Sequence, residues 1–108
     1  MIAVIFELWP KDERRKDYFD LAKALKNELE AIDGFISVER FESVSEPGKF
    51  VSLSFWRDED AVKRWRNAMN HRKAQIAGRE GIFRDYRLRV ASVMRDYGMR
   101  ERDQVPKE

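Results

Sequence analysis

The chain has 108 residues, which is enough for one hydrophobic core and predicts a single domain. Its 22 Lys and Arg residues nearly balance 20 Asp and Glu residues, so the net charge of +2 exerts little long-range attraction on nucleic acid. The chain has no cysteine, which excludes disulfides, thiolate catalysis and cysteine-ligated metals. No apolar run reaches the length of a membrane span. We therefore expect a cytoplasmic protein with neither a nucleic-acid nor a membrane partner.

The first half of the chain predicts a strand, a helix and a second strand. Residues 2–9 are rich in β-branched and aromatic side chains and stop at a proline, as a strand does. Residues 12–32 repeat apolar side chains every three to four positions, which predicts an amphipathic helix with Asp12 as its cap. Asp-Gly at 33–34 is expected to end this helix tightly. Residues 35–44 then predict the second strand.

The second half predicts a strand, a helix and a last strand. Residues 50–56 alternate regularly, and they form a hairpin with the strand before them. Asp58 fits the N-cap of a helix that Asn70 is expected to break or cap. Residues 83–93 alternate again and predict the fourth strand. On residues 50–56, one face should carry Val51, Leu53 and Phe55, and the other Phe50, Ser52, Ser54 and Trp56.

The order of these elements predicts a ferredoxin-like βαββαβ fold of the α+β class, with an antiparallel sheet and both helices on one face. We expect this domain to span residues 1–94, and residues 95–108 to form a polar, mobile tail. The second sheet face still carries apolar side chains on residues 2–9 and 50–56. An exposed apolar patch of this kind indicates an interface. We therefore expect a homodimer in which two sheets face each other and enclose a pocket.

Several short motifs resemble the antibiotic biosynthesis monooxygenase (ABM) superfamily. They are Asp-Gly-Phe at 33–35, Ser-Phe-Trp at 54–56 followed by Arg-Asp-Glu-Asp-Ala at 57–61, and a Trp, a His and a Tyr in the closing half. The resemblance covers residues 1–94 and implies a dimeric α+β barrel. Members of this superfamily include cofactor-free oxygenases of polyketide-like quinols, heme-degrading monooxygenases and quinol oxygenases.

The catalytic residues of the family carry over only in part. Cofactor-free polyketide oxygenases pair an asparagine with a tryptophan four residues later, whereas here Ala61 stands four residues before Trp65. Heme-degrading members use an asparagine on the first strand, where this chain has Phe6 or Glu7. They also place the heme-ligating histidine about ten residues after the tryptophan, and His71 follows Trp65 by six. These departures weaken the heme interpretation and leave the fold assignment intact.

Two residues of the second helix are the catalytic candidates. His71 is the one histidine, and its ordinary pKa near neutrality suits a proton shuttle or a heme ligand. The structural alternative is that His71 caps a helix junction and bonds a backbone carbonyl. Trp65 could form the wall of a pocket for a flat substrate. The alternative, favoured by its helical spacing, is a core anchor beneath the sheet.

The strands supply the substrate-binding candidates. Trp9 and Trp56 are expected near strand ends on the pocket side, where they stack on a ligand or fill the dimer interface. Ser52 and Ser54 make one strand face small and polar, which suits either a cavity with hydrogen-bonding groups or a solvent-facing surface. Tyr86 is expected to shape the cavity.

Charged residues on the strands have two interpretations as well. Glu7, Glu39, Arg87 and Arg89 must pair if they face inward, because an unpaired buried charge is costly. Arg87 could then bind substrate or stabilise an enolate or peroxide anion. The alternative is a set of salt bridges between subunits.

The sequence favours a monooxygenase that oxidises a small quinol- or phenol-like aromatic with O₂ and no cofactor. In that hypothesis His71 or a pocket carboxylate deprotonates the substrate, and the aromatic residues named above shape the cavity. One alternative is a heme-binding or heme-degrading monooxygenase. Another is a non-catalytic dimeric barrel that binds a ligand. No spacing of histidines and carboxylates suits a metal site, and no metal is expected.

Overall fold

The computed structural model describes residues 1–75 and 81–107, with side chains described for residues 1–69 and 81–107. The elements follow the order β-α-β-β-α-β, with one short 3-10 turn before the first helix. Their bounds are β1 Ile2–Pro10, the 3-10 turn Asp12–Arg14, α1 Arg15–Glu30, β2 Phe35–Glu42, β3 Phe50–Trp56, α2 Glu59–Gln75 and β4 Phe83–Ser92.

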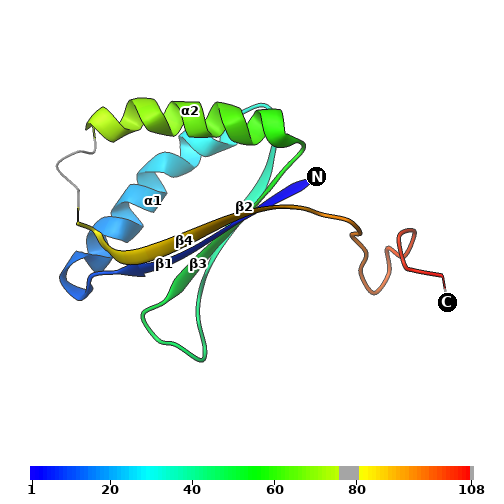
Figure 1. Ribbon diagram of the computed structural model, residues 1–108, viewed down its shortest axis with the longest axis horizontal. Coiled ribbons are helices and arrows are strands. Elements are labelled where there is room, and N and C mark those ends of the chain that lie inside the picture. The colour runs from blue at the N-terminus through cyan, green and yellow to red at the C-terminus, as the bar shows by residue number, and fades with distance from the viewer. Residues whose placement is uncertain (76–80, 108) are drawn as a thin grey trace.

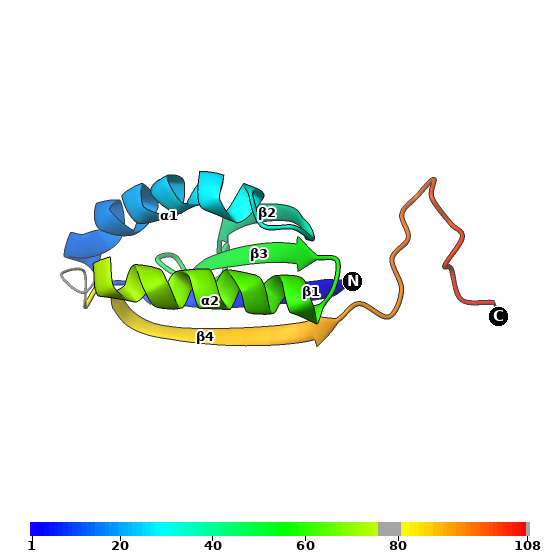
Figure 2. The same ribbon diagram turned by 90° about the horizontal axis from the view of Figure 1, so that it is seen from above.

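The strands form one sheet in the order β2-β3-β1-β4, and every neighbouring pair is antiparallel. Both helices cover the same face of this sheet, and the other face is left open (Figure 1). Seen from above, α1 lies towards β2 and α2 lies towards β4 (Figure 2). The predicted ferredoxin-like α+β fold is therefore confirmed.

The core fills the layer between the helices and the sheet in two clusters. The cluster at the start of β1 is built around Ile2, Leu29, Trp56 and Ala61, each at most 8% exposed, with Trp65 packed against it. The cluster at the end of β1 contains Leu8, Tyr18, Phe50 and Ile82, with Phe6 packed against it. Between the two clusters run the central rows of the sheet, which carry Ser52 and Ser54. The functional candidates on the helix-facing side lie within or beside this layer.

Two details of the helices differ from the prediction. Asp12 does not cap α1: it begins the 3-10 turn, and neither that turn nor α1 has a side-chain cap bond. The helix α2 does not break at Asn70, because it continues to Gln75. Asp58 does cap α2, since its carboxylate accepts a hydrogen bond from the Ala61 N–H at 2.9 Å.

A register shift in β2 changes which side chains face the helices. The shift falls between Phe35 and Ser37, so Phe35 and Val38 both pack on the core although they are three residues apart. A bulge of this kind reverses the alternation beyond it. As a result Arg40 faces the helices, and Phe41 is left 45% exposed on the open face.

Residues beyond β4 leave the body of the fold and extend away from the sheet (Figure 1). Met94 and Met99 are 81% and 88% exposed there, so this segment adds little to the core. A domain of residues 1–94 with a mobile tail remains a prediction. No helix in the described ranges 1–75 and 81–107 is long and apolar enough to cross a membrane.

Candidate functional site

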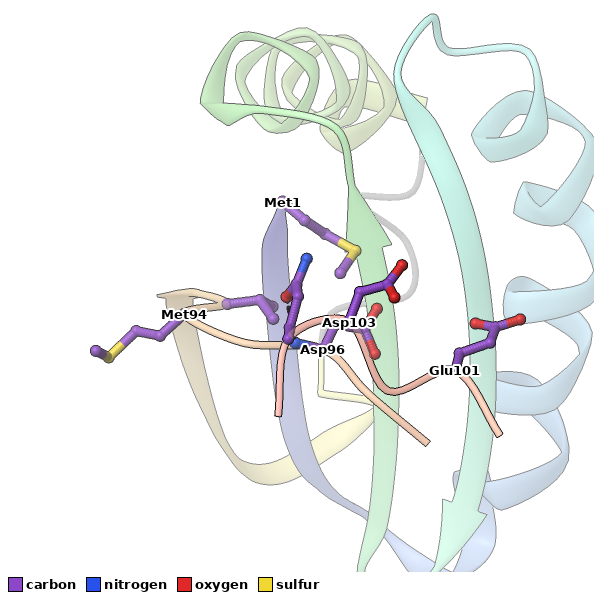
Figure 3. Close-up of a pocket in the computed structure, with 7 residues that line it drawn as sticks. Met1, Met94, Asp96, Glu101 and Asp103 are labelled. Atoms are coloured by element: carbon purple, nitrogen blue, oxygen red, sulfur yellow. Dashed lines mark hydrogen bonds between the residues drawn. The ribbon is translucent and has the colours of Figure 1, made fainter. Parts of the chain in front are cut away.

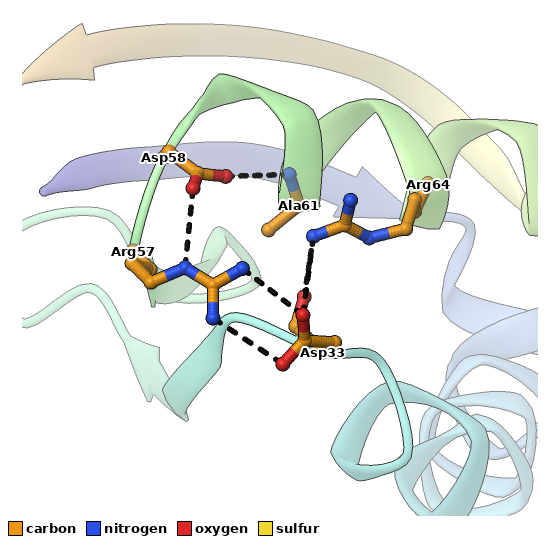
Figure 4. Close-up of polar contacts among 5 residues, drawn as sticks. All are labelled: Asp33, Arg57, Asp58, Ala61 and Arg64. Carbon is orange, nitrogen blue, oxygen red and sulfur yellow. Dashed lines mark hydrogen bonds and ion pairs between the residues drawn. The ribbon is translucent and has the colours of Figure 1, made fainter.

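The motif residues 33–34 and 57–61 fold into one polar junction between the end of α1 and the start of α2 (Figure 4). The Arg57 guanidinium donates to both Asp33 carboxylate oxygens, at 3.2 and 3.0 Å, and to Asp58 at 3.1 Å. Arg64 donates to the Asp33 backbone carbonyl at 3.0 Å. The junction is exposed, and its arginines and carboxylates are engaged with one another. These motif residues therefore link the end of α1 to the start of α2.

The charges of this junction shift one another's pKa values in the expected directions. Hydrogen bonds from Arg57 lower the pKa of Asp33, and the charges of Arg57 and Arg64 add to this. The backbone N–H of Ala61 and then the Arg57 side chain lower the pKa of Asp58. The pKa of Arg57 is raised by the same contacts. The junction thus stays fully ionised near neutral pH.

The two tryptophans on the helix-facing side lie together. Trp56 is 1% exposed, and its ring stacks on Trp65 with centroids 6.4 Å apart. The Trp56 indole N–H donates to the Ser54 hydroxyl at 2.9 Å, and Ser54 is itself 7% exposed. Ser54 therefore does not face solvent, and its hydroxyl satisfies a buried donor. Trp65 anchors α2 on the core, in agreement with its structural alternative; a role in binding substrate remains a prediction.

Trp9 and Arg87 lie on the opposite, open face of the sheet. Trp9 pairs across the strands with Asp85, and the Lys49 ammonium lies 5.1 Å from the centre of its ring. Arg87 is the cross-strand neighbour of Glu7, on the sheet face that the helices do not cover. The structure therefore separates Trp9 and Arg87 from Trp56 and both serines, although the sequence analysis grouped them at one pocket.

Glu7 forms two ion pairs on the open face of the sheet, as expected for a strand charge that is largely removed from solvent. Its carboxylate lies 3.2 Å from Arg89 and 3.8 Å from Lys49, on the open face, and its side chain is 23% exposed. These contacts form within one subunit. Pairing across subunits, the other interpretation of these charges, remains a prediction.

Tyr86 occupies the helix-facing side at the outer strand β4. It is 61% exposed, and its ring contacts Phe6 at 5.7 Å between centroids. Tyr86 is the register partner of Leu8, so it lies one row away from Phe6 and Ser52, which are partners of each other. His71 belongs to α2, but its side chain lies outside the described residues, so its predicted role is open.

Arg40 is the residue that sequence reasoning missed. It is the register partner of Ser52, on the helix-facing side, and its Nε is buried without a hydrogen-bond partner among the described residues. No carboxylate among residues 1–69 and 81–107 forms an ion pair with its guanidinium. The sequence signal was its spacing from Val38: residues two positions apart on a strand share a face, so Arg40 lies on the same face as this core residue. The bulge at Ser37 hid its direction.

Tyr18 of α1 stands over Arg40. Tyr18 is 5% exposed, and its burial raises the pKa of its hydroxyl, while the charge and hydrogen bonding of Arg40 act against this. The phenol therefore stays protonated at neutral pH. Together with Ser52, the two residues form a polar group of one cation and two hydroxyls beside the apolar cluster around Leu8 and Phe50. We call Arg40, Tyr18 and Ser52 the inner polar cluster.

A separate hollow of about 410 Å³ lies where the tail leaves the domain (Figure 3). It is lined by Met1, by the segment after β4 and by three acidic side chains, Asp96, Glu101 and Asp103. None of the predicted site residues borders it. No group of three metal-ligating side chains occurs among the described residues.

The family model for antibiotic biosynthesis monooxygenases matches residues 1–77, and the chain belongs to this family. A jasmonate monooxygenase of Pyricularia oryzae is 50% identical over 93 residues, which are 86% of this chain and 43% of the relative. The chain thus spans less than half the length of that relative. The Bacillus subtilis protein YqjZ is 31% identical over 93 residues, covering 86% of this chain and 79% of its own.

Solved structures agree on the fold. A Deinococcus radiodurans structure assigned to the same family superposes with a TM-score of 0.77 at 16% identity, covering 92% of this chain and 98% of its own. A variant of SnoaB, a cofactor-independent oxygenase from Streptomyces nogalater, gives 0.69 at 11%, with 88% and 94% covered. A variant of MhuD with manganese protoporphyrin IX bound gives 0.71 at 16%, with 91% and 99% covered. The fold thus occurs both in a cofactor-independent oxygenase and in a porphyrin-bound protein.

Proposed function

We propose that this chain is a monooxygenase that inserts one atom of O₂ into a small organic substrate held between its helices and its sheet. The observation that carries the proposal is 50% identity to a named monooxygenase over 86% of the chain. The helix-facing layer supports it, because aromatic walls there surround the inner polar cluster. Such a combination of apolar walls and a few polar groups is typical of a small-molecule site.

A quinol- or phenol-like aromatic is the substrate class that needs no cofactor. When a phenol becomes a para-quinone, one oxygen atom enters the ring carbon and the other leaves as water. The substrate loses four electrons, two bonds to hydrogen break, and O₂ accepts all four electrons. No outside reductant is required. In this chain Trp65, Trp56 and Tyr86 are proposed to shape the site, and His71 to take the phenol proton.

A second substrate class follows from the name of the Pyricularia oryzae relative, which points to a jasmonate, a carboxylate. If an oxygen atom enters a C–H bond of such a molecule to give an alcohol, the substrate supplies only two of the four electrons. The other two must come from an external two-electron reductant, such as a reduced nicotinamide or a thiol. The two substrate classes therefore differ in whether oxygen consumption needs added reductant.

Oxygen uptake distinguishes these outcomes directly. The purified chain is given a panel of phenols, quinols and jasmonate under ¹⁸O₂, with and without a reduced nicotinamide. One labelled oxygen per product and unchanged uptake in the presence of catalase would support a monooxygenase. Hydrogen peroxide released in equal amount to the O₂ consumed would show an oxidase. No uptake with any substrate would favour the non-catalytic binding barrel.

The heme alternative depends on His71, whose side chain the structure does not describe, so no step is derived through a porphyrin. A hemin titration followed by absorbance addresses it. A saturable Soret shift that is lost in His71→Ala would place heme chemistry first. An identical shift in both proteins would exclude His71 as the ligand.

A homodimer through the open sheet face remains the proposed assembly, and a cytoplasmic location the proposed compartment. The centre of this face is apolar: Ala3 lies opposite Phe55, and Ile5 opposite Leu53. No helix covers these side chains (Figure 1). Burying them against a second copy would yield roughly 25 cal/mol for each Å² of apolar surface.

A further inference from the structure

One donor of the partly buried Arg40 guanidinium, its Nε–H, lacks a hydrogen-bond partner among the described residues. The Nε–H is inaccessible to solvent and donates to no oxygen of the described residues. Buried donors are almost always satisfied, and leaving one unsatisfied destabilises a fold. Arginine stays charged at all ordinary pH values, so the site cannot relieve the cost by losing a proton. This N–H is therefore a donor that a bound ligand could satisfy.

The local backbone shows that this arrangement is not the one stability alone would select. The bulge between Phe35 and Ser37 turns Arg40 towards the helices and leaves Phe41 45% exposed. The alternation therefore places a cation, and not its apolar neighbour, among the side chains that face the helices. Departures from the local hydrophobic pattern are expected mainly at functional sites. The other strand arginine with a known partner, Arg89, pairs with Glu7 on the open face.

We propose that Arg40 binds a negatively charged oxygen of the substrate, so that the substrate carries an acidic O–H group, as a phenol or a carboxylic acid does. The inference deepens the proposed function, on which it rests, by naming the chemical class that the helix-facing layer selects. The guanidinium presents parallel N–H donors that match a carboxylate in two bonds and a phenolate in one. Both substrate classes discussed above share this anionic oxygen.

The neighbours of Arg40 suit such a ligand. Tyr18 lies within hydrogen-bonding reach of Arg40, and its raised pKa keeps its O–H available as a donor. Ser52 pairs with Arg40 across the strands and presents a second hydroxyl to the same layer. Phe6, the next residue across the sheet, provides an apolar surface for the rest of the molecule. An anion bound here would accept hydrogen bonds from one charged group and two neutral hydroxyls. It would not have to displace a carboxylate of the described residues from Arg40.

For a phenol, this contact also has a chemical consequence. A cation next to a bound acid typically lowers the pKa of that acid by about 1 to 3 units. Arg40 would thus favour the phenolate, the electron-rich form that can reduce O₂. Arg40 acts on the reacting oxygen itself in this case. For a carboxylate it would position the substrate.

Two matched probe pairs test the proposal without requiring turnover. The first is 4-nitrophenol against 4-nitroanisole, its methyl ether, and the second is 4-nitrobenzoate against its methyl ester. Both pairs are titrated into the wild-type protein. We expect the acid of at least one pair to bind more than tenfold more tightly than its methylated form. The pair that shows the difference identifies the phenol or the carboxylate as the source of the charge.

Variants then assign the preference to Arg40. In Arg40→Gln we expect the anion to bind about 10- to 100-fold more weakly, the range for losing a charged hydrogen bond. For bound 4-nitrophenol, whose phenolate absorbs in the visible, the apparent pKa should rise towards the free value. Arg66→Gln removes an exposed arginine of α2 and should leave both readouts unchanged. Arg40→Lys, which keeps the charge, serves if the glutamine variant does not fold, and should weaken carboxylate binding more than phenolate binding.

Equal binding of acid and methylated probe to the wild type would overturn the proposal, as would failure of all four probes to bind. An unchanged anion preference in Arg40→Gln would overturn it too. Anion binding that depends on Arg40, in a protein that consumes no oxygen with any substrate, would support the Arg40 contact and refute the monooxygenase. Oxygen uptake with an unchanged KM for phenols in Arg40→Gln would do the opposite.

Discussion

Gly34 follows α1 and lies against the start of α2, so adding one methyl group there tests how closely these two segments must pack. Its φ of +92° is a conformation that residues with a side chain rarely adopt, and an added Cβ would lie 2.6 Å from the Ala61 Cβ. Gly48 has nearly the same φ, +91°, but its added Cβ would meet only the end of Arg15, at 3.6 Å. Gly48→Ala therefore measures backbone strain alone, about 1–2 kcal/mol. Gly34→Ala adds overpacking of about 1–3 kcal/mol, so we expect a total of about 2–5 kcal/mol.

Urea unfolding followed by tryptophan fluorescence measures these values, because Trp56 is almost fully buried. All proteins are compared at one concentration, since a dimer's stability depends on it. Ala61→Gly should be destabilising by about 1 kcal/mol on its own but neutral or stabilising on top of Gly34→Ala, giving a coupling of at least about 1 kcal/mol. If Gly34→Ala and Gly48→Ala are equally destabilising, or if the double variant is additive, the close contact between Gly34 and α2 does not constrain the fold.

Three further predictions concern the buried indole, the acidic junction and the open face. Ser54→Ala should lower the free energy of unfolding by about 1–3 kcal/mol, because it leaves a buried N–H without an acceptor, whereas Ser52→Ala should change it by less than half of that; equal effects would contradict the assignment. The lowered pKa of Asp33 predicts stability that is present above its unfolded value of 3.8 and is lost as the pH falls through the lower folded value. Asp33→Asn should therefore be less stable than wild type at pH 7, and the difference should close on acidification in unfolding curves. Leu53→Lys should halve the apparent mass by light scattering if the open face is the dimer interface, while Val44→Lys, at a fully exposed loop position, should not; an unchanged dimer in both would exclude that face.

The fold could be predicted because its signals are local. Residues 50–56 alternate without interruption, and the structure places Phe50, Ser52, Ser54 and Trp56 on one face as expected. Asp58 caps α2 as its position before an amphipathic stretch predicts. Gly34 ends the first helical unit with a positive φ, which the Asp-Gly pair indicates. Each of these signals involves only a few neighbouring residues.

The site could be predicted much less well because it depends on which face each strand presents. Trp9 and Trp56 are alike in residue type and in position near strand ends, yet the sheet register places them on opposite faces. Arg87, the arginine expected at the pocket with the serines, lies on the open face, whereas Arg40, for which no role was predicted, lies beside Ser52. The one-residue bulge in β2 decides which face Arg40 occupies, and the residue types from Phe35 to Ser37 do not indicate a bulge. A period-two pattern cannot reveal its own interruption.

The family motifs and the proposed substrate-binding residues lie in different parts of the fold. This separation explains why the motifs identify the fold better than the substrate. The motif residues Asp33, Arg57 and Asp58 bind one another between the end of α1 and the start of α2. Arg40 is not part of this junction, because it lies beside Ser52 in the sheet. They can therefore be retained while the helix-facing layer changes. Substrate choice should follow the few polar side chains of that layer, because an apolar wall discriminates weakly between similar molecules whereas a buried cation strongly rejects a ligand that leaves it unpaired. Arg40 is thus the residue whose replacement by an apolar side chain should change which substrates are accepted without changing the architecture.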